Sequence, residues 1–517
     1  MLRLRFPLLL SLAAFAITTA ACSSCTEAPA EGEGEGEGEG EGEGEGEGEG
    51  EGEGEGEGEG EGEGEGEGEG EGEGEGEAPP RLITGGGAGD GAIDGLLHVH
   101  VIDTTTGDAL EGAVVTVGDN PNLDGVTDAA GLATFRDATI LDGAVDITVT
   151  RAGVAPTTWL GVNGTNVTIP VVVRATVPGA PGYGELDVTM PDLSGLSLGG
   201  GADYLIVGAN TSSLRQLGDR ANDIDRAAQP RCTTHPYATI GDCDDGFTMR
   251  SRTGTVAVLA TIVQVEDNGT PGNPLDDEVV GVRAYAAARG VVVTDGSDQN
   301  VALTLIDDAD VDDVTADFPN TEPAGLGEDA ALAALDLGDT EGILFCEGTF
   351  FTLDDATQPV PGARTLFANA VGTQLAGIAS DGNDPAVRQT LSILRDIDVS
   401  ATVVLPDWLA PADGITVSGT SSITITHDAM TGAALRTMEL RHPVVPGAWD
   451  LLWSVVVFDG RAAVTLPALS VDPIASGAHE IVVNGVDLPG FDPGDFEVDA
   501  FNDEVARFAS AHDSFTH

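Results

Sequence analysis

Two cysteines in the middle of this 517-residue chain have the spacing of a short covalent bridge. Cys232 and Cys243 bracket the stretch "CTTHPYATIGDC", whose Pro236 and Gly241 favour a tight loop. We expect them to form a disulfide, which would stabilise a loop of this length by about 3 kcal/mol on the loop-entropy model. Such a bridge indicates an oxidising compartment. Cys25 and Cys346 are left over, and Cys346 lies in the apolar run "GILFC" and is expected to be buried.

Oxygen-bearing side chains gather in several loops and suggest calcium binding. The strongest candidate is "VEDNGTPGNPLDDEVVG", where acids cluster beside an expected strand and can converge. Its candidate ligands are Asp267, Asn268, Asp276, Asp277 and Glu278. The loop "DNPNLDGVTD" is weaker, because an EF-hand would need Asp at Asn120 and Glu at Gly131. Turn-forming Asn and Asp explain that loop without a metal. Calcium is the only cofactor that the sequence suggests.

One serine matches a catalytic pattern without its expected context. Gly195-Leu196-Ser197-Leu198-Gly199 fits the nucleophile elbow G-x-S-x-G, which needs a strand before the serine and a helix after it. Here a glycine-rich loop leads into the strand-like "ADYLIV". All 21 basic residues are arginine, so lysine-dependent chemistry is excluded. We therefore expect a protein that is not an enzyme.

His98 and His100 lie two residues apart in an alternating segment, on one face of an expected strand. Two imidazoles on one face could bind a metal together. No third ligand is evident nearby, so a solvated polar face is the favoured interpretation. Leu97, Val99 and Val101 occupy the opposite face, which we expect to be the core.

The N-terminus has the layout of a secretory signal. Arg3 and Arg5 precede an apolar run that is too short to span a bilayer, and small residues lead to Cys22. This end resembles the lipobox of bacterial lipoproteins, although Thr19 stands where that family has Leu. The resemblance implies cleavage after residue 21, acylation of Cys22 and attachment to a membrane. The alternative is an ordinary signal with Cys22 incidental.

Ser23 after the cysteine is similar to Gram-negative lipoproteins sorted to the outer membrane. We therefore expect an outer-membrane lipoprotein of a Gram-negative bacterium. Two orientations stay open, toward the periplasm or toward the medium.

Residues 31–76 are twenty-three perfect Glu-Gly pairs, closed by Glu77. Nothing apolar is present, so no core can offset the entropy of ordering this tract, and we expect a disordered spacer. A neutral coil of this length would span about 40 Å, and full extension would reach roughly 160 Å. Repulsion between the glutamates should place the tract between these limits. The tract would hold the folded part away from the membrane.

From Ile93 the pattern becomes β-like, and a family resemblance follows from "VIDTTTGDALEGAVVTVG…GVTDAAGLATF". The string resembles a carboxypeptidase regulatory-like domain. The matching positions are Asp103, Thr106, Gly107, Leu110, Gly112, Ala113, Val115, Thr127, Asp128 and Gly131. The resemblance implies a transthyretin-like β-sandwich over about 80 residues that is non-catalytic and accompanies other domains.

The remaining chain alternates short β-like runs with acidic turns, which is typical of β-sandwiches. The fold class is therefore mainly β, with tandem immunoglobulin/transthyretin-like β-sandwiches after the spacer. Residues 328–335 are expected to form a short helix. "GVNGTNVTIPVVV" and "VTDGSDQNVALTLI" are weakly alike and suggest an internal repeat. The expected divisions are signal 1–21, lipidated linker 22–92, regulatory-like sandwich 93–175, and β-rich domains 183–337 and 338–517.

Charge limits the partners. The formal net charge is −67, and removing the 24 glutamates of the tract still leaves −43. Nucleic acid is excluded, because phosphate binding needs basic patches. We expect a non-catalytic envelope or cell-surface protein that binds, adheres or scaffolds, held in the membrane by lipid and contacting an unidentified protein or carbohydrate. The alternative is an envelope hydrolase acting on glycan or peptide, with the regulatory-like domain as an accessory.

Overall fold

The structure is a computed structural model that describes the chain from Pro79 to His517. Within this span it leaves out residues 105, 119–122, 174–182, 197–203, 213–230, 234–245, 267–277, 307–310, 319–321, 347–356, 362–365, 368–369, 382–387, 400, 420–421, 446–447, 470–473 and 475. The expected signal peptide, Cys22 and the Glu-Gly spacer lie outside the described residues. Across the described part, no helix is long and apolar enough to cross a membrane.

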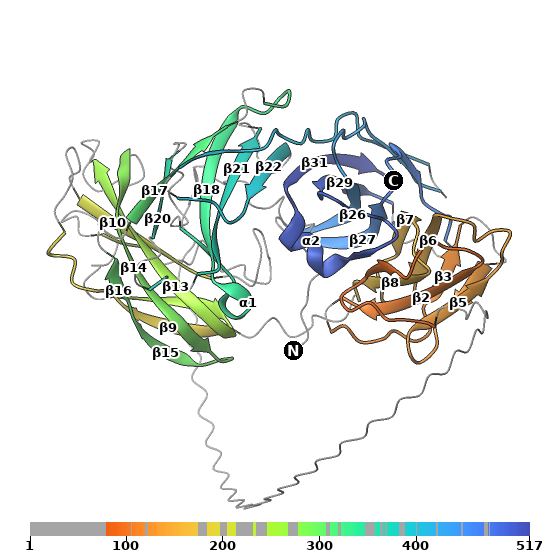
Figure 1. The fold of residues 1–517 in the computed structure, drawn as a ribbon, viewed down its shortest axis with the longest axis horizontal. Helices are drawn as coiled ribbons and strands as arrows, with labels where there is room; N and C mark the ends of the chain where they lie inside the picture. Colours follow the sequence, from red (N-terminus) through yellow and green to blue (C-terminus); the bar gives the residue numbers. More distant parts are fainter. Residues whose placement is uncertain are drawn as a thin grey trace, which may run out of the picture. The chain divides into compact units, whose positions relative to one another are not determined.

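Strands make up nearly all of the regular structure (Figure 1), and their pairing divides the described chain into four β-sandwiches. The first sandwich contains β2 (Leu96–Asp103), β3 (Val114–Val117), β4 (Asp124–Val126), β5 (Leu132–Arg136), β6 (Val145–Thr150), β7 (Thr157–Val162) and β8 (Asn166–Val171). The second contains β9 (Tyr183–Thr189), β10 (Tyr204–Thr211), β11 (Arg231–Thr233), β12 (Phe247–Arg252), β13 (Gly254–Glu266), β14 (Glu278–Val293), β15 (Asp298–Ala302) and β16 (Thr304–Ile306).

The other two sandwiches follow in sequence. The third contains β17 (Val311–Asp317), β18 (Glu328–Asp336), α1 (Gly338–Glu341), β19 (Ile343–Phe345), β20 (Thr357–Pro361), β21 (Gly372–Ser380), β22 (Arg388–Leu394) and β23 (Thr402–Val404). The fourth contains β24 (Thr416–Ser418), β25 (Thr424–Thr426), β26 (Leu435–Val445), β27 (Ala448–Val457), β28 (Ala463–Thr465), β29 (Ala478–Asp487), α2 (Val498–Glu504) and β31 (Arg507–Thr516). The short strand β1 (Gly87–Gly89) precedes them all. The short strand β30 (Phe496–Glu497), just before α2, pairs with β1 and so joins the sheet of the first sandwich.

One topology is repeated through the chain. In each of the first three sandwiches, the first strand pairs antiparallel with the fourth and parallel with the seventh. The opposing sheet places the third, second, fifth and sixth strands in that order, as in β4-β3-β6-β7. The fourth sandwich keeps this second sheet as β27-β26-β29-β31. The expected fold class, mainly β with tandem immunoglobulin/transthyretin-like sandwiches, is confirmed.

The two stretches that looked alike in the sequence occupy equivalent places. The first contains β8 and the second contains β15, and each is the seventh strand of its sandwich, parallel to the first. The weak similarity therefore reflects a repeated position in the fold. The expected boundary at residue 338 falls between β18 and β19, which are paired strands of one sheet. As folding units, the residue ranges expected from sequence stay a prediction.

Three of the sandwiches share one sheet, because their edge strands pair with one another. β22 of the third sandwich pairs antiparallel with β31 of the fourth, from Arg388↔Ala511 to Ser392↔Arg507. β27 of the fourth pairs in parallel with β7 of the first, from Ser454↔Thr157 to Val457↔Leu160. The result is a single sheet of twelve strands. Pairing satisfies backbone groups that an isolated sandwich would leave open at its edges.

The expected helix at residues 328–335 is wrong, since this segment is the strand β18. Ala and Leu have high helix propensity, but propensity is a weak local preference. β18 pairs along its whole length with β21, from Glu328↔Ser380 to Asp336↔Gly372. Its two faces both meet apolar clusters, with Ala331 and Ala333 on one side and Leu332 on the other. Burial on both faces hides the alternation that would have identified a strand.

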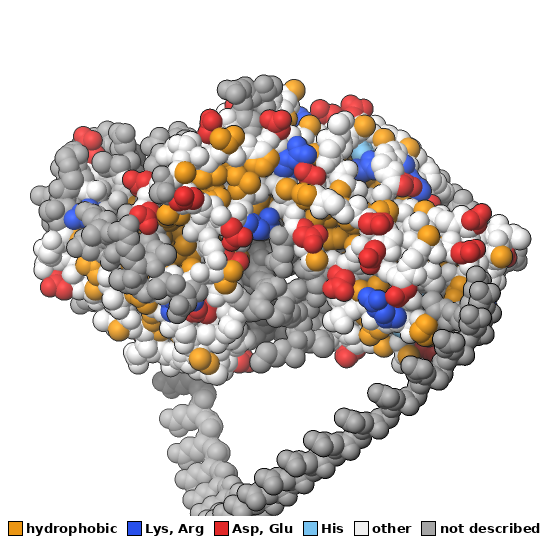
Figure 2. Space-filling model, viewed as in Figure 1, with side chains coloured by type: hydrophobic (Ala, Val, Ile, Leu, Met, Phe, Trp, Pro, Cys, Tyr) orange, Lys and Arg blue, Asp and Glu red, His pale blue; other side chains and the backbone are white. Residues whose placement is uncertain are grey.

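Acidic side chains are the more frequent charged groups on the face shown in Figure 2. On the face shown in Figure 2, red Asp and Glu side chains lie among a few blue arginines. Outside the Glu-Gly tract the chain has 64 acidic and 21 basic residues, a net charge of −43 (64 − 21), so most acidic side chains have no basic side chain to pair with. Repulsion between like charges therefore outweighs attraction between opposite ones in the compact state.

Added salt should raise the thermal midpoint of the folded part by at least a few degrees, because screening weakens this repulsion. Most of the rise should occur below about 0.2 M, where the Debye length falls from about 30 Å to about 8 Å. Calorimetry in a sodium chloride series would measure it. A rise that begins only at molar salt would indicate exclusion of salt from the surface instead, and a constant or falling midpoint would contradict the prediction.

Candidate functional site

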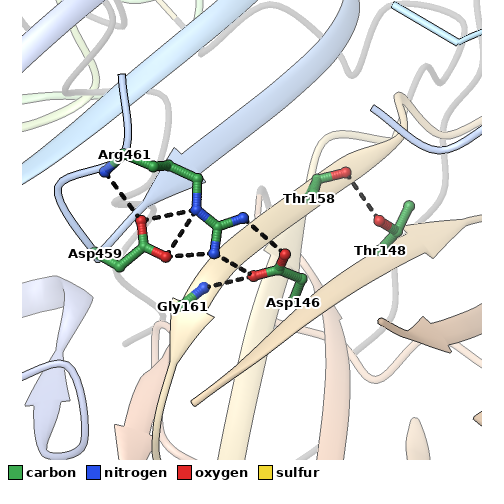
Figure 3. Close-up of polar contacts among 6 residues, drawn as sticks. All are labelled: Asp146, Thr148, Thr158, Gly161, Asp459 and Arg461. Carbon is green, nitrogen blue, oxygen red and sulfur yellow. Dashed lines mark hydrogen bonds and ion pairs between the residues drawn. The ribbon is translucent and has the colours of Figure 1, made fainter. Parts of the chain in front are cut away.

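An arginine-centred cluster joins the first and fourth sandwiches. Arg461, in the connection between β27 and β28, lies between two carboxylates in Figure 3. Its Nη1 donates to Asp146 Oδ2 at 2.8 Å and its Nη2 to Asp146 Oδ1 at 3.0 Å. Its Nε contacts both oxygens of Asp459, at 2.8 and 2.7 Å. The planar guanidinium thus binds both carboxylates at once, a geometry that lysine cannot reproduce.

The cluster is locked by backbone and hydroxyl contacts on β6 and β7. Gly161 N–H donates to Asp146 Oδ1 at 2.9 Å. Gly161 has φ +78°, and a Cβ there would lie 2.7 Å from Asp459 Cβ, so only glycine fits. Beside it, Thr148 and Thr158 share a hydroxyl hydrogen bond of 3.1 Å (Figure 3). Trp453 Nε1–H of the fourth sandwich donates to Thr158 Oγ1 at 3.0 Å, which extends the joint.

The electrostatics of the joint follow from these contacts. Hydrogen bonding to Asp459, and then to Asp146, raises the pKa of Arg461 above its ordinary value. The side chains are about one-third exposed, so solvent screens the pair. The cluster links the first and fourth sandwiches, but it contains no nucleophile. Sequence reasoning missed this ion pair, because 315 residues separate Asp146 from Arg461.

His98 and His100 do not form a solvated face, which corrects the sequence expectation. Both are buried, at 3% and 6% exposure. The parallel register aligns them with Asn166 and Thr168 of β8. Backbone N–H groups of residues 81 and 83 bond to those same two side chains, so the segment before β1 lies over this face. His98 Nδ1 lies 3.0 Å from Thr134 Oγ1.

No metal centre accompanies the histidine pair. Among the described residues, no group of three or more His, Cys, Asp or Glu side chains is arranged to hold a metal ion. Burial, and then the neighbouring His98, lower the pKa of His100, while Asp128 acts in the opposite direction. The Nδ1 of His100 is buried without a hydrogen-bond partner. His100 is therefore held neutral more readily than an exposed histidine.

Asp128, one end of the weaker calcium loop, has a structural role. Its Oδ1 accepts hydrogen bonds from the backbone N–H groups of Ala130 at 2.8 Å and Leu132 at 3.0 Å. These contacts are those of a turn-forming Asp, as the sequence indicated. Asn120 of the same loop lies outside the described residues.

The core face predicted for β2 is confirmed, with Leu97, Val99 and Val101 fully buried.

The main calcium candidates are not brought together by the described structure. Four of them, Asp267, Asn268, Asp276 and Asp277, lie outside the described residues. Glu278 is the first residue of β14 and pairs with Glu266 of β13. Calcium binding there stays a prediction.

The remaining sequence candidates have different fates. Cys232 lies on β11 opposite Val207, and Cys243 lies outside the described part, so the disulfide stays a prediction. Cys346 is buried, as expected. Ser197 also lies outside the described residues, and the next element is the strand β10.

A concavity of about 350 Å³ lies in the third sandwich and was not foreseen. Apolar side chains, such as Leu335, Val360 and Phe367, form much of its wall. Asp312, Asp396 and Asp398 complete it, and the described lining includes no basic side chain. Asp396 adopts φ +53°, which places its carboxylate over Gly372. The acids come from two distant segments, which is why sequence spacing could not reveal the concavity.

Replacing Arg461 with Gln should lower the free energy of unfolding by about 1–2 kcal/mol, since the two carboxylates lose the cation that binds both of them, although Arg436 still acts on Asp459. Arg81→Gln is a suitable control, because Arg81 is 52% exposed and pairs with the single carboxylate of Asp90, so the expected loss is below about 1 kcal/mol. Urea unfolding would measure both. Equal losses would show that the Arg461 cluster contributes no more than an ordinary surface pair.

Stability should fall as the pH drops below about 6.5, because the unfolded chain binds a proton at His100 and the folded chain resists it. The folded pKa is lowered, so the contribution is present above the unfolded pKa and is lost below it. His427, whose pKa burial also lowers, acts with the same sign. Thermal melts from pH 5 to 8 should show that the melting temperature depends less steeply on pH in His100→Gln than in the unaltered chain. The dependence should be flatter still in the double variant, His100→Gln with His427→Gln. An unchanged slope in both would contradict this prediction.

Comparison with known proteins gives only distant likenesses. No family model and no curated protein sequence matches the chain. Among solved structures, the Bacillus anthracis TIE protein matches at 12% identity and a TM-score of 0.13, over 61% of this chain and 48% of that one. A putative carbohydrate-binding protein from Bacteroides uniformis matches at 11% identity and a TM-score of 0.13, over 38% of this chain and 99% of that one.

The FN1–FN3 domains of chicken CNTN1 match at 11% identity and a TM-score of 0.13, over 66% of this chain and 89% of that one. The chain thus spans about half the length of the TIE structure. At this TM-score, the likenesses establish neither fold nor function.

Proposed function

We propose that the chain is a non-catalytic, lipid-anchored envelope protein that presents joined β-sandwiches for binding or adhesion. The observation that carries this proposal is the joining itself: two edge-to-edge pairings unite three sandwiches in one sheet. A continuous sheet keeps surfaces on different sandwiches in fixed register, which suits a scaffold or a binding surface. The alternative, an envelope hydrolase, gains no support from the strand β10 that follows the serine motif, where a helix would be needed.

The sequence supplies the rest of the proposal. The basic start, the apolar run and the small residues before Cys22 support a lipid anchor, and the Glu-Gly tract supports a spacer. Several acyl chains on one cysteine would give the multi-chain attachment that stable anchoring requires. The partner would be a protein or carbohydrate at the outer membrane, on its periplasmic or its external side. Strong negative charge argues against anionic partners.

Cys22→Ala should move the protein from the membrane fraction to the soluble fraction, because the acylated thiol is lost. Cys25→Ala is the matched control, three residues along the same leader, and should stay with the membrane. Fractionation followed by detection of the C-terminal half measures both variants. Membrane retention of the Cys22 variant would overturn the lipid anchor. Protease treatment of intact cells carrying the unaltered protein would then assign the side of the membrane.

A further inference from the structure

The Glu-Gly tract lies directly before the described part of the chain in the sequence. The tract ends at Glu77, and the described chain begins at Pro79. Any pull along the tract therefore enters the fold through residues 79–90, which we call the strap. The strap crosses the face of the first sandwich on which His98 and His100 lie. It then reverses direction and runs antiparallel to β8 as β1.

Asn166 of β8 holds both ends of the strap. Its side chain is fully buried. Its Oδ1 accepts the N–H of Arg81 at 2.8 Å, and its Nδ2 donates to Pro79 O at 3.4 Å and to Asp90 Oδ2 at 3.0 Å. Arg81 and Asp90 also form an ion pair of 3.0 Å. One amide thus uses both of its donor protons and its carbonyl oxygen to close the loop between entry and exit.

Buried contacts also hold the middle of the strap against β8. Thr168, also fully buried, accepts the N–H of Ile83 at 2.9 Å, and Ile83 itself is 2% exposed. The chain then turns through Gly86 at φ +109°, where a Cβ would lie 2.7 Å from Pro170 Cδ. Only glycine permits this close approach. The strap therefore cannot shift along β8 without breaking buried contacts.

β1 is bonded on both of its edges. It pairs antiparallel with β8 of the first sandwich and antiparallel with β30, which the chain connects through α2 to β31 of the fourth. A Cβ at Gly87 would lie 2.2 Å from Phe496 O, so the contact with β30 is very close. The N–H of Val498, at the start of α2, donates to Gly86 O at 2.9 Å. The strap therefore touches the first sandwich and the end of the fourth.

We propose that the strap is a force-bearing anchor that divides tension from the tract between the first and fourth sandwiches. Asn166 passes load from Pro79 and Arg81 directly to β8 and Asp90, so the loop between them is bypassed. The two ladders of β1 then share what remains, since their hydrogen bonds must break together when the strand is drawn along its axis. The proposal rests on the proposed membrane anchor only for the origin of the tension.

Asn166→Asp tests the anchor. The substitution removes both donated hydrogen bonds and sets a carboxylate against Pro79 O and Asp90 Oδ2. Asn163→Asp is the matched control, because Asn163 Oδ1 accepts only the N–H of Ile93, at 3.3 Å, outside the strap. Magnetic tweezers would hold residues 22–517 by handles at both ends. Release of the strap should appear as an early step of about 40 Å.

The expected result is a lower force for that step in Asn166→Asp than in the unaltered chain, with Asn163→Asp unchanged. An early step at the same force in all three chains would overturn the proposal. Since the instrument supplies the force, failure here would leave the lipid anchor untouched, and failure of the Cys22 fractionation would leave this result standing.

Hydrogen exchange keeps the proposal testable if Asn166→Asp does not fold. In the unaltered protein, the amides of Arg81 and Ile83 should exchange as slowly as those of β2, because both donate to buried side chains. If Asn166→Asp folds, the Arg81 amide should exchange about tenfold faster or more. Exchange of both amides at the rate of an open chain in the unaltered protein would overturn the anchor.

Discussion

Hydrogen bonding between edge strands of different sandwiches is the constraint on which the rest of the structure depends. A β-sandwich leaves backbone N–H and C=O groups open at its sheet edges, and proteins must cover or pair them. Here β22 pairs with β31, and β27 pairs with β7, so those edges are satisfied within the chain. The apolar packing follows the same path. One continuous cluster includes Trp159 of the first sandwich, Leu391 of the third and Phe508 of the fourth.

Arginine makes the charged contacts described at the joints, and the chain has no lysine to share that role. Between the second and third sandwiches, Glu341 accepts from Arg289 Nε at 2.9 Å and from Gly290 N–H at 2.7 Å. Between the third and fourth, Arg395 Nη1 donates to Val505 O at 2.6 Å. A fork of fixed donors can reach a carboxylate and a backbone group together, whereas an ammonium group is a point charge. Arginine therefore gives these joints a defined hydrogen-bond geometry in addition to electrostatic attraction.

What the sequence could reveal was local. Alternation identified β2 and its core face, because successive side chains of a strand point to opposite faces. Turn chemistry identified the role of Asp128 for the same reason. The failures share a different cause: β18 and the His98 face were misjudged because their surroundings come from distant segments. The Arg461 joint and the acidic concavity likewise depend on pairings across hundreds or tens of residues. A single sequence carries no sign of such pairings.

The closure of the chain on itself has a consequence for folding. β1 needs β30 on one edge, and these strands stand at opposite ends of the described sequence. Contacts of such separation form late, because the loop between them costs entropy before any contact repays it. The repeated sandwiches can pair internally as they emerge, but the strap cannot be completed until the last strands exist. The contacts of the strap with β8 can therefore form early, whereas the edge of β1 that pairs with β30 is completed late.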